Sequence, residues 1–236
     1  MHVKSVRPRQ LLSSAARLTL GNELYLRLRR RLLQFRSNRR AFTAIYERHL
    51  WGADETVSGD GSTLEWAASL CDTLPRLLAE LGAESLLDAG CGDFNWMKTV
   101  DLSGVRYIGI DVVEPLIKRN VELYSSQSRT FLTADITKDR LQSADVAFCR
   151  HCFIHLSNRQ VCAALRNLKN SGAKYLLATT FPIVPNNADI WPGSFRPINL
   201  EIQPFNLPRP LRIFRDSIPT DRSSVLALWR LADVSI

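Results

Sequence analysis

The chain has 236 residues, of which 45% are hydrophobic and 23% charged, with a formal net charge of +8 at pH 7. This length can bury a full core and suits one domain with an appendage better than two domains. No run of about 18 apolar residues and no apolar stretch before a small-residue cleavage site occurs, so we expect neither a membrane span nor a secretory signal. We therefore predict a cytoplasmic protein.

The positive charge is concentrated in one segment. Residues 1–40 contain eleven Lys and Arg and a single acidic residue, Glu23, whereas the rest of the chain carries a net charge of −2. A basic chain suggests nucleic-acid binding, but the body of the protein has no such bias. We therefore divide the chain into a basic N-terminal helical arm, residues 1–40, and a main domain, residues 41–236.

The arm contains a basic amphipathic segment. Residues 24–35 place five apolar side chains on one helical stripe, with arginines elsewhere on the surface. We interpret this segment as a solvated helix or arm. Peripheral contact with the anionic inner face of a membrane, contact with nucleic acid and a transit peptide are the alternatives.

The main domain alternates strand and helix patterns. A glycine-rich polar stretch at residues 50–63 precedes a helix predicted over residues 63–81. Strands are predicted at 85–89, 105–110, 129–134, 144–150, 174–180, 211–217 and 225–231, and helices at 94–100, 114–124 and 158–170. This order predicts an α/β, Rossmann-like doubly wound sheet of seven strands that ends in an antiparallel hairpin.

A proline-rich insertion interrupts this order. Residues 181–210 contain seven prolines and no helical period. Proline fixes φ and removes a backbone donor, so we expect an ordered but irregular excursion. It leaves the end of the fifth strand, and we interpret it as the wall that faces an acceptor.

The stretch "SLLDAGCGDFNW" suggests a ligand site. Its apolar start is typical of a central parallel strand that is buried on both faces. Gly90 and Gly92 then fall at the carboxyl end of that strand, where open α/β sheets bind ligands against bare backbone. The third glycine of a dinucleotide fingerprint is absent, because Asn95 occupies its position.

Acidic residues at successive strand ends strengthen this prediction. Asp88 lies within the first strand, Asp111 ends the second and Asp135 ends the third. A carboxylate at the end of the second strand can accept both ribose hydroxyls of a nucleoside. A carboxylate at the end of the third can receive an adenine amino group.

These motifs resemble the class I S-adenosylmethionine-dependent methyltransferases over about residues 43–231. The resemblance rests on "LLDAGCGDF", "YIGIDVV", "LTADIT" and "ADVAFCRHCFIHLS", and on the closing strands "LRIFRDSI" and "VLALWRL". Within that family the chain is similar to a bacterial group with "YxxxWG", "SGxGST" and "CGDFNWM", which we connect loosely with modification of glycans or related hydroxyl compounds. The resemblance implies an enzyme that uses S-adenosylmethionine.

The resemblance also implies a set of site residues. The cofactor-binding residues would be Asp88, Gly90, Gly92, Asp111, Val112, Asp135, Ile136, Arg150, Ser58 and Gly59. In this set the glycines would border the methionine moiety, Asp111 the ribose, and Asp135 with Ile136 the adenine. Ser58 and Gly59 belong to a glycine-rich loop that could close over the amino-acid end, or form a plain turn before the helix.

The predicted reaction is methylation of a hydroxyl group of a sugar, glycan or other small acceptor. Removal of the hydroxyl proton near neutral pH favours a histidine base, and His151 and His155 follow the fourth strand. His155 could instead pin the loop, and His151 could be a solvent-facing strand end. The substrate-binding candidates in the excursion are Arg196, Asn199, Glu201 and Asn206.

A metal ion is not expected. Mg²⁺ could assist such an enzyme, but His151 stands where the resemblance leads us to expect an aspartate, which argues against a carboxylate-bound ion. Cys149 and Cys152 lack a second cysteine pair, so we interpret them as buried hydrophobic residues. The alternatives to the methyltransferase are a nicotinamide-dependent oxidoreductase and a non-catalytic adapter with a cofactor fold.

Overall fold

The computed structural model describes residues 37–216 and 224–236. The predicted helix at residues 24–35 lies outside the described residues. Residues Asn38–Ile236 form one compact unit. Its first helix, α3, spans Asn38–Glu47, so the predicted boundary at residue 40 falls within this helix.

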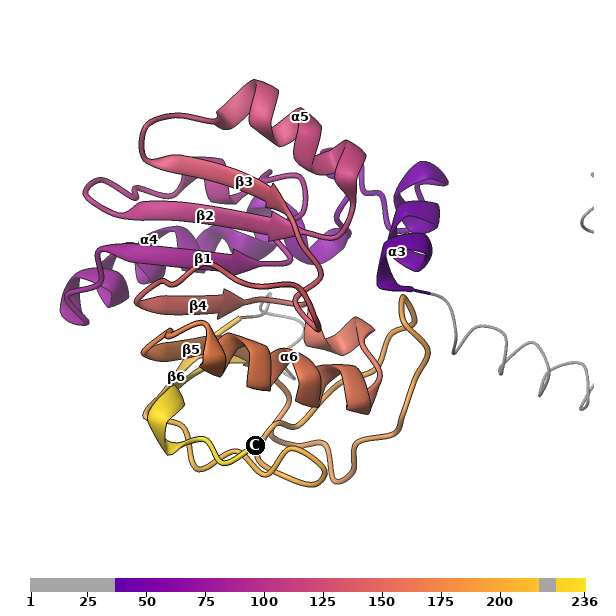
Figure 1. Cartoon of the computed structure of the whole chain (residues 1–236), viewed down its shortest axis with the longest axis vertical. Helices are drawn as coiled ribbons and strands as arrows, with labels where there is room; N and C mark the ends of the chain where they lie inside the picture. Colours follow the sequence, from indigo (N-terminus) through magenta and orange to yellow (C-terminus); the bar gives the residue numbers. More distant parts are fainter. Residues whose placement is uncertain (1–36, 217–223) are drawn as a thin grey trace, which may run out of the picture. The chain divides into compact units, whose positions relative to one another are not determined.

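A seven-stranded sheet organises the domain (Figure 1). Its strands are β1 (Ser85–Ala89), β2 (Arg106–Asp111), β3 (Arg129–Thr133), β4 (Val146–Cys149), β5 (Tyr175–Thr180), β6 (Arg212–Arg215) and β7 (Val225–Arg230). Their spatial order is β3-β2-β1-β4-β5-β7-β6. Strands β1 to β5 are parallel, while β7 is antiparallel to both β5 and β6. The predicted fold class and its terminal antiparallel hairpin are confirmed.

Helices cover both faces of the sheet, as Figure 1 shows for α4 (Leu64–Glu80) and α6 (Asn158–Asn170). One core cluster packs α6 against Leu87, and the other packs α4 against Leu86. Successive residues of a strand point to opposite faces, so β1 must be apolar at both positions. All five residues of β1 are buried, as its continuous apolar sequence predicted.

Helix ends follow the local sequence. Ser157 and Gln160 form the predicted capping box at the start of α6, with both reciprocal hydrogen bonds present. Thr63 caps α4 through a bond from the Trp66 backbone N–H. Helix α5 spans Glu114–Tyr124, as predicted, and packs beside β3.

The helix predicted at residues 94–100 is wrong. Only a short 3₁₀ turn, Met97–Thr99, occurs there. Phe94 adopts a φ of 60°, and its ring is buried against Tyr107 and Phe131. A left-handed backbone at Phe94 prevents a regular helix from starting there. The chain after the glycines is therefore shaped by packing of this aromatic side chain.

Candidate functional site

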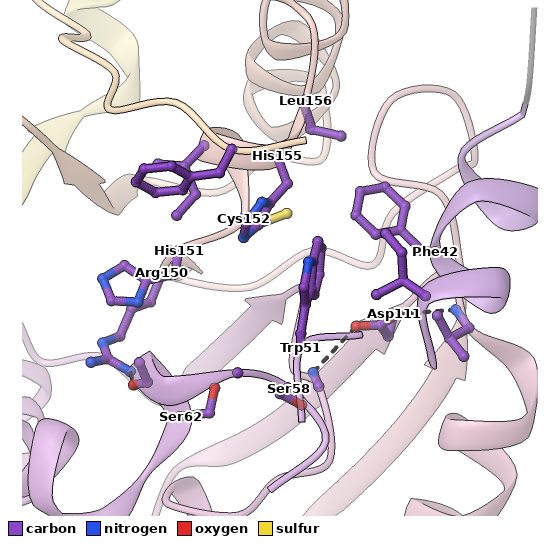
Figure 2. Close-up of a pocket in the computed structure, with 18 of the residues that line it drawn as sticks. Phe42, Trp51, Ser58, Ser62, Asp111, Arg150, His151, Cys152, His155 and Leu156 are labelled. Carbon is purple, nitrogen blue, oxygen red and sulfur yellow. Dashed lines mark hydrogen bonds between the residues drawn. The ribbon is translucent and has the colours of Figure 1, made fainter. Parts of the chain in front are cut away.

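A cavity of about 880 Å³ opens at the carboxyl ends of the parallel strands. Its walls come from those strand ends, from α3 and the following loop, and from the proline-rich excursion. Figure 2 shows Trp51 at its centre, between His151 and Arg150 on one side and Asp111 on the other. This position is the one at which open α/β sheets bind ligands.

Bare backbone forms the floor of this cavity. Gly90 and Gly92 have φ values of 89° and 55°, which side chains rarely adopt. A Cβ on Gly90 would lie 3.0 Å from the Cys152 Sγ, and one on Gly92 would lie 2.4 Å from the Ser58 Oγ. The two predicted glycines therefore provide both the turn and the space that a ligand needs.

Asp111 lies in the cavity at the end of β2. Its two carboxylate oxygens accept bonds from the backbone N–H groups of Gly92, at 3.2 Å, and Val113, at 3.0 Å. Burial raises the pKa of Asp111. The carboxylate therefore joins the glycine turn to the β2 end while remaining part of the cavity wall, and Val112 lies beside it in that wall.

Asp135 and Ile136 also line the cavity, at the end of β3. The Asp135 Oδ1 accepts bonds from the backbone and side chain of Thr137 and from the Asn38 Nδ2, at 3.0 Å. Gln160 donates in turn to the Asn38 Oδ1, at 2.6 Å. Asn38, which the sequence analysis missed, thus fastens the start of α3 to the cavity, and no local pattern could have indicated this long-range bond.

Asp88 lies beneath the glycine turn rather than in the cavity wall. Its side chain is buried, and its Oδ2 accepts a bond from the Tyr107 hydroxyl, at 2.7 Å. Burial raises its pKa to about 7, although the bond from Tyr107 opposes the shift. Asp88 therefore supports the turn from below, and direct contact with a ligand does not fit its position.

The glycine-rich loop is tied to the turn by Asp93. The Asp93 carboxylate accepts bonds from the Thr56 hydroxyl, the Val57 backbone N–H and the Ser58 hydroxyl, all at 2.9 Å. The Asp93 backbone N–H donates to the Ser58 Oγ. Ser58 and Gly59 line the cavity, so this network closes the loop over the glycine turn.

His151 and Arg150 share a buried carboxylate. The Arg150 Nε donates to the Asp216 Oδ1 at 2.8 Å, and the His151 Nε2 lies 3.4 Å from the Asp216 Oδ2. Arg150 also donates to the Gly61 carbonyl, at 2.6 Å, which holds the glycine-rich loop. Arg150 and His151 both line the cavity, and the Arg150 Nη2 is buried there with no hydrogen-bond partner among the described residues. Asp216, which the sequence analysis missed, lies just after β6 in the motif "RIFRDSI".

His155 supports the cavity wall. Its Nδ1 donates to the Ser194 carbonyl at 2.8 Å, and its ring stacks on Trp51 at a centroid separation of 4.2 Å. Burial lowers the pKa of His155 to about 4, so the imidazole is neutral and weakly basic near pH 7. This environment fits the interpretation that His155 pins the loop and argues against a role as the base.

Trp51 was missed as a site residue, although the quoted "YxxxWG" motif contains it. The edge of Phe42 meets its ring at 5.7 Å, while His155 covers one face. A large aromatic side chain thus separates the Asp111 and His151 sides of the cavity in Figure 2.

The four predicted substrate residues of the excursion lie outside the cavity wall. The Arg196 guanidinium is buried and donates to three backbone carbonyls and to Asn158. Asn199 donates to the Pro182 and Val184 carbonyls, and the Glu201 backbone bonds to Asn199. Asn206 occupies a turn with a φ of 50°. These polar side chains stabilise the irregular segment because its backbone lacks sheet or helix partners.

The excursion instead lines the cavity with apolar residues. These are Phe181, Ile183, Val184, Phe195 and Pro197. The excursion therefore reaches the cavity, but the side chains that it contributes are apolar rather than the predicted polar ones.

No cluster of three or more His, Cys, Asp or Glu side chains that could hold a metal ion occurs within residues 37–216 and 224–236. Over the same residues, no helix has the length and apolar character needed to cross a membrane.

The parallel sheet with its antiparallel end and its glycine-turn cavity is the architecture of the class I S-adenosylmethionine-dependent methyltransferases. Residues 64–197 match the methyltransferase domain family, to which the chain belongs. The class identified from the sequence, S-adenosylmethionine-dependent methyltransferase, is confirmed.

Solved structures share this fold. The chain is similar to magnesium protoporphyrin IX methyltransferase from Synechocystis PCC 6803, solved with S-adenosylmethionine, at 16% identity and a TM-score of 0.56, over 83% of this chain and 98% of that one. It is also similar to 1,6-didemethyltoxoflavin-N1-methyltransferase from Burkholderia thailandensis, at 18% identity and a TM-score of 0.57, over 81% and 86%. The chain spans 66% of the methyltransferase domain of bacterial CtHen1-C. A search of the curated proteins found no match.

Proposed function

We propose that the chain is an S-adenosylmethionine-dependent O-methyltransferase that modifies a hydroxyl group of a neutral small acceptor. The observation that carries this proposal is that one cavity is lined both by Gly90, Gly92 and Asp111 and by His151, whose Nε2 lies 3.4 Å from the Oδ2 of the buried Asp216 behind the wall. The first group suits a nucleoside cofactor, and the second suits removal of a hydroxyl proton.

The residues present fit this cofactor. Asp111 would accept bonds from the ribose hydroxyls, and Val112 with Ile136 would flank the adenine at the β2 and β3 ends. Asp135 would receive the adenine amino group. The glycine floor, which a Cβ at Gly90 or Gly92 would fill, leaves space for the methionine moiety. The Ser58 loop, fastened by Asp93, would cover that end.

His151 is proposed as the general base. The His151 Nε2 lies 3.4 Å from the Asp216 Oδ2, so a tautomer with its proton on Nε2 would present the Nδ1 as the proton-accepting nitrogen. When bound, S-adenosylmethionine would supply a methyl group on a positively charged sulfur, which would keep the electron pair of the broken carbon–sulfur bond. His151 would take the proton from the acceptor hydroxyl, whose oxygen would form the new bond to the methyl carbon.

The acceptor is proposed to be neutral because of the wall that faces it. The residues that the excursion contributes to the cavity are all apolar, and the Arg150 guanidinium is already paired with Asp216. A charged group on the acceptor would lose its hydration at this wall and would find no oppositely charged side chain there to compensate. The four polar residues on which a glycan interpretation depended do not line the cavity, so a sugar chain is a weaker candidate than an apolar alcohol or phenol.

Calorimetric binding of S-adenosylhomocysteine and of NAD, each measured separately, tests the cofactor assignment. We expect the wild-type protein to bind the sulfur nucleoside and not NAD, and Asp111→Asn to weaken binding by about 10- to 100-fold, the cost of disturbing a hydrogen bond to a charged group. Asp101→Asn is the matched control, because Asp101 bonds only to neighbouring Ser103 on the surface. Preference for NAD, or no binding of the nucleoside, would refute the proposal.

A second experiment tests the base. Purified protein with radiolabelled S-adenosylmethionine is screened against phenols, apolar alcohols and sugars. We expect transfer to a hydroxyl compound of the first two groups, and we expect His151→Gln to reduce the rate by about 10²- to 10⁴-fold. Retention of the wild-type rate in that variant would exclude His151 as the base.

A further inference from the structure

The cavity mouth exposes large apolar side chains. Phe195 is 62% exposed, Ile183 is 78% exposed and Leu50 is 62% exposed, and all three line the same cavity. Single exposed apolar residues are common on protein surfaces and need no explanation. Here three of them line one cavity, and we call Leu50, Ile183 and Phe195 the apolar rim.

Phe195 is held in its exposed position by ordered backbone on both sides. The Ser194 carbonyl accepts the bond from the His155 Nδ1, and the Arg196 backbone N–H donates to the Ile154 carbonyl at 3.1 Å. The Arg196 side chain is buried and fully bonded to the same region. A phenylalanine between two such anchored residues cannot easily fold back into the core, so its exposure is a fixed property of the excursion.

Aromatic rings connect this rim to the cavity interior. Phe195 lies 6.2 Å from the His155 ring, which stacks at 4.2 Å on Trp51, and the edge of Phe42 lies 5.7 Å from Trp51. Aromatic side chains at these separations form an apolar surface that accepts another flat ring by stacking or edge contact. The apolar surface is thus continuous from the interior to the solvent-exposed mouth.

We infer that the acceptor is an amphiphilic phenol, with its hydroxyl-bearing ring inside the cavity and an apolar chain lying across the rim formed by Leu50, Ile183 and Phe195. This inference deepens the proposed function and rests on it. A small polar acceptor would leave the rim in water. An apolar chain that covers the rim removes both its own surface and that of the three side chains from water.

The inference is tested by titrating phenol, 4-butylphenol and 4-octylphenol into protein saturated with S-adenosylhomocysteine. Each methylene that leaves water contributes about 0.8 kcal/mol, or about a fourfold gain in affinity. We therefore expect affinity to rise from phenol to 4-butylphenol and again to 4-octylphenol. Glucose, the polar comparison, should not bind detectably.

Substitutions in the apolar rim distinguish binding at the rim from nonspecific hydrophobic binding to the protein surface. We expect Phe195→Ser and Ile183→Ser each to lower the affinity for 4-octylphenol about tenfold and that for phenol by a smaller factor, since only the octyl chain extends across the rim. Leu123→Ser is the matched control, because Leu123 is 56% exposed on α5 and does not line the cavity. Equal affinity for the three phenols, or an unchanged chain-length dependence in both rim variants, would overturn the inference.

Failure of the proposed function gives a different result. If the wild-type protein does not bind S-adenosylhomocysteine, the cofactor assignment fails before any phenol is added. If it binds the nucleoside but shows no chain-length dependence, the methyltransferase proposal stands and only the amphiphilic acceptor is refuted.

Discussion

The His151 imidazole packs directly against the backbone of Gly61, so closely that a Cβ on Gly61 would lie 2.3 Å from the His151 Nδ1. Arg150, the neighbour of His151, donates to the Gly61 carbonyl. The glycine-rich loop and the end of β4 therefore position each other. Because Gly61 has no side chain, the His151 Nδ1, which is the proposed proton acceptor, fits beside the loop.

Gly61→Ala should displace the His151 ring. Alanine is acceptable to the backbone at this position, so the strain falls on the imidazole rather than on the loop. We expect a changed His151 imidazole signal in NMR spectra and a methyl-transfer rate lowered by about 10²-fold. Gly52→Ala, in the same loop, is the control, because its Cβ would meet nothing closer than 3.7 Å. An unchanged His151 signal in Gly61→Ala would contradict this account.

Asp93→Asn should loosen the loop that carries Ser58. Replacing one carboxylate oxygen by an NH₂ group removes an acceptor from a site that receives three donors. We expect faster hydrogen exchange at residues 56–62 and S-adenosylhomocysteine affinity lowered about tenfold, since the loss corresponds to about one hydrogen bond. Asp101→Asn, which alters a similar surface turn, should leave both quantities unchanged. Unaltered exchange in the loop of Asp93→Asn would refute the proposed role.

Asp88→Asn should change how stability depends on pH. The pKa of Asp88 is raised by burial from its ordinary value of 3.8 to about 7, so the folded state holds an extra proton between these pH values. The wild-type protein consequently loses stability as pH rises from about 4 to 7, whereas the variant cannot lose that proton. We expect the unfolding free energy of the variant relative to wild type to rise over this range and to stay constant above it, measured by urea denaturation.

Asp145→Asn is the control for the Asp88 measurements, because the pKa of Asp145 is lowered in the folded protein whereas that of Asp88 is raised. The hydrogen bond from Lys174 is the main cause that lowers the pKa of Asp145 to about 2. Its contribution to stability is present above pH 3.8 and is lost as pH falls toward 2. The Asp145 variant should therefore be less stable than wild type at neutral pH, with the difference closing in acid. Parallel curves for Asp88→Asn and wild type would contradict the raised pKa.

Arg196→Met should destabilise the proline-rich excursion. The change leaves the Phe153, Leu156 and Ala188 carbonyls without their side-chain donor, at a cost of about 1–3 kcal/mol for each buried group that finds no water. Burial lowers the pKa of Arg196 to about 10, so it remains charged at neutral pH. Arg209→Met, at an exposed position of the same segment, should change the unfolding free energy little. Equal stability of the two variants would show that these bonds contribute nothing.

The sequence by itself determined the sheet and the half of the cavity that contains Gly90, Gly92 and Asp111. The apolar run of β1, the glycines after it and the acids at the ends of β2 and β3 are local patterns, and parallel strands bring their carboxyl ends to one edge. The capping box at Ser157 and the α5 bounds follow from patterns of the same short range. Each of these predictions depends on residues only a few positions apart.

Only the tertiary structure decided which side chains complete the rest of the cavity and support its walls. Asp216 meets Arg150 across 66 residues, and Asn38 meets Asp135 across 97. In the excursion, the sequence correctly indicated an irregular segment at the cavity, but Arg196 and Asn199 turned inward while Phe195 lines the mouth. A segment without a helical or strand period carries no pattern that says which side chains face inward. Its polar side chains were drawn to the unpaired backbone carbonyls of the segment, and the apolar ones were left to line the cavity.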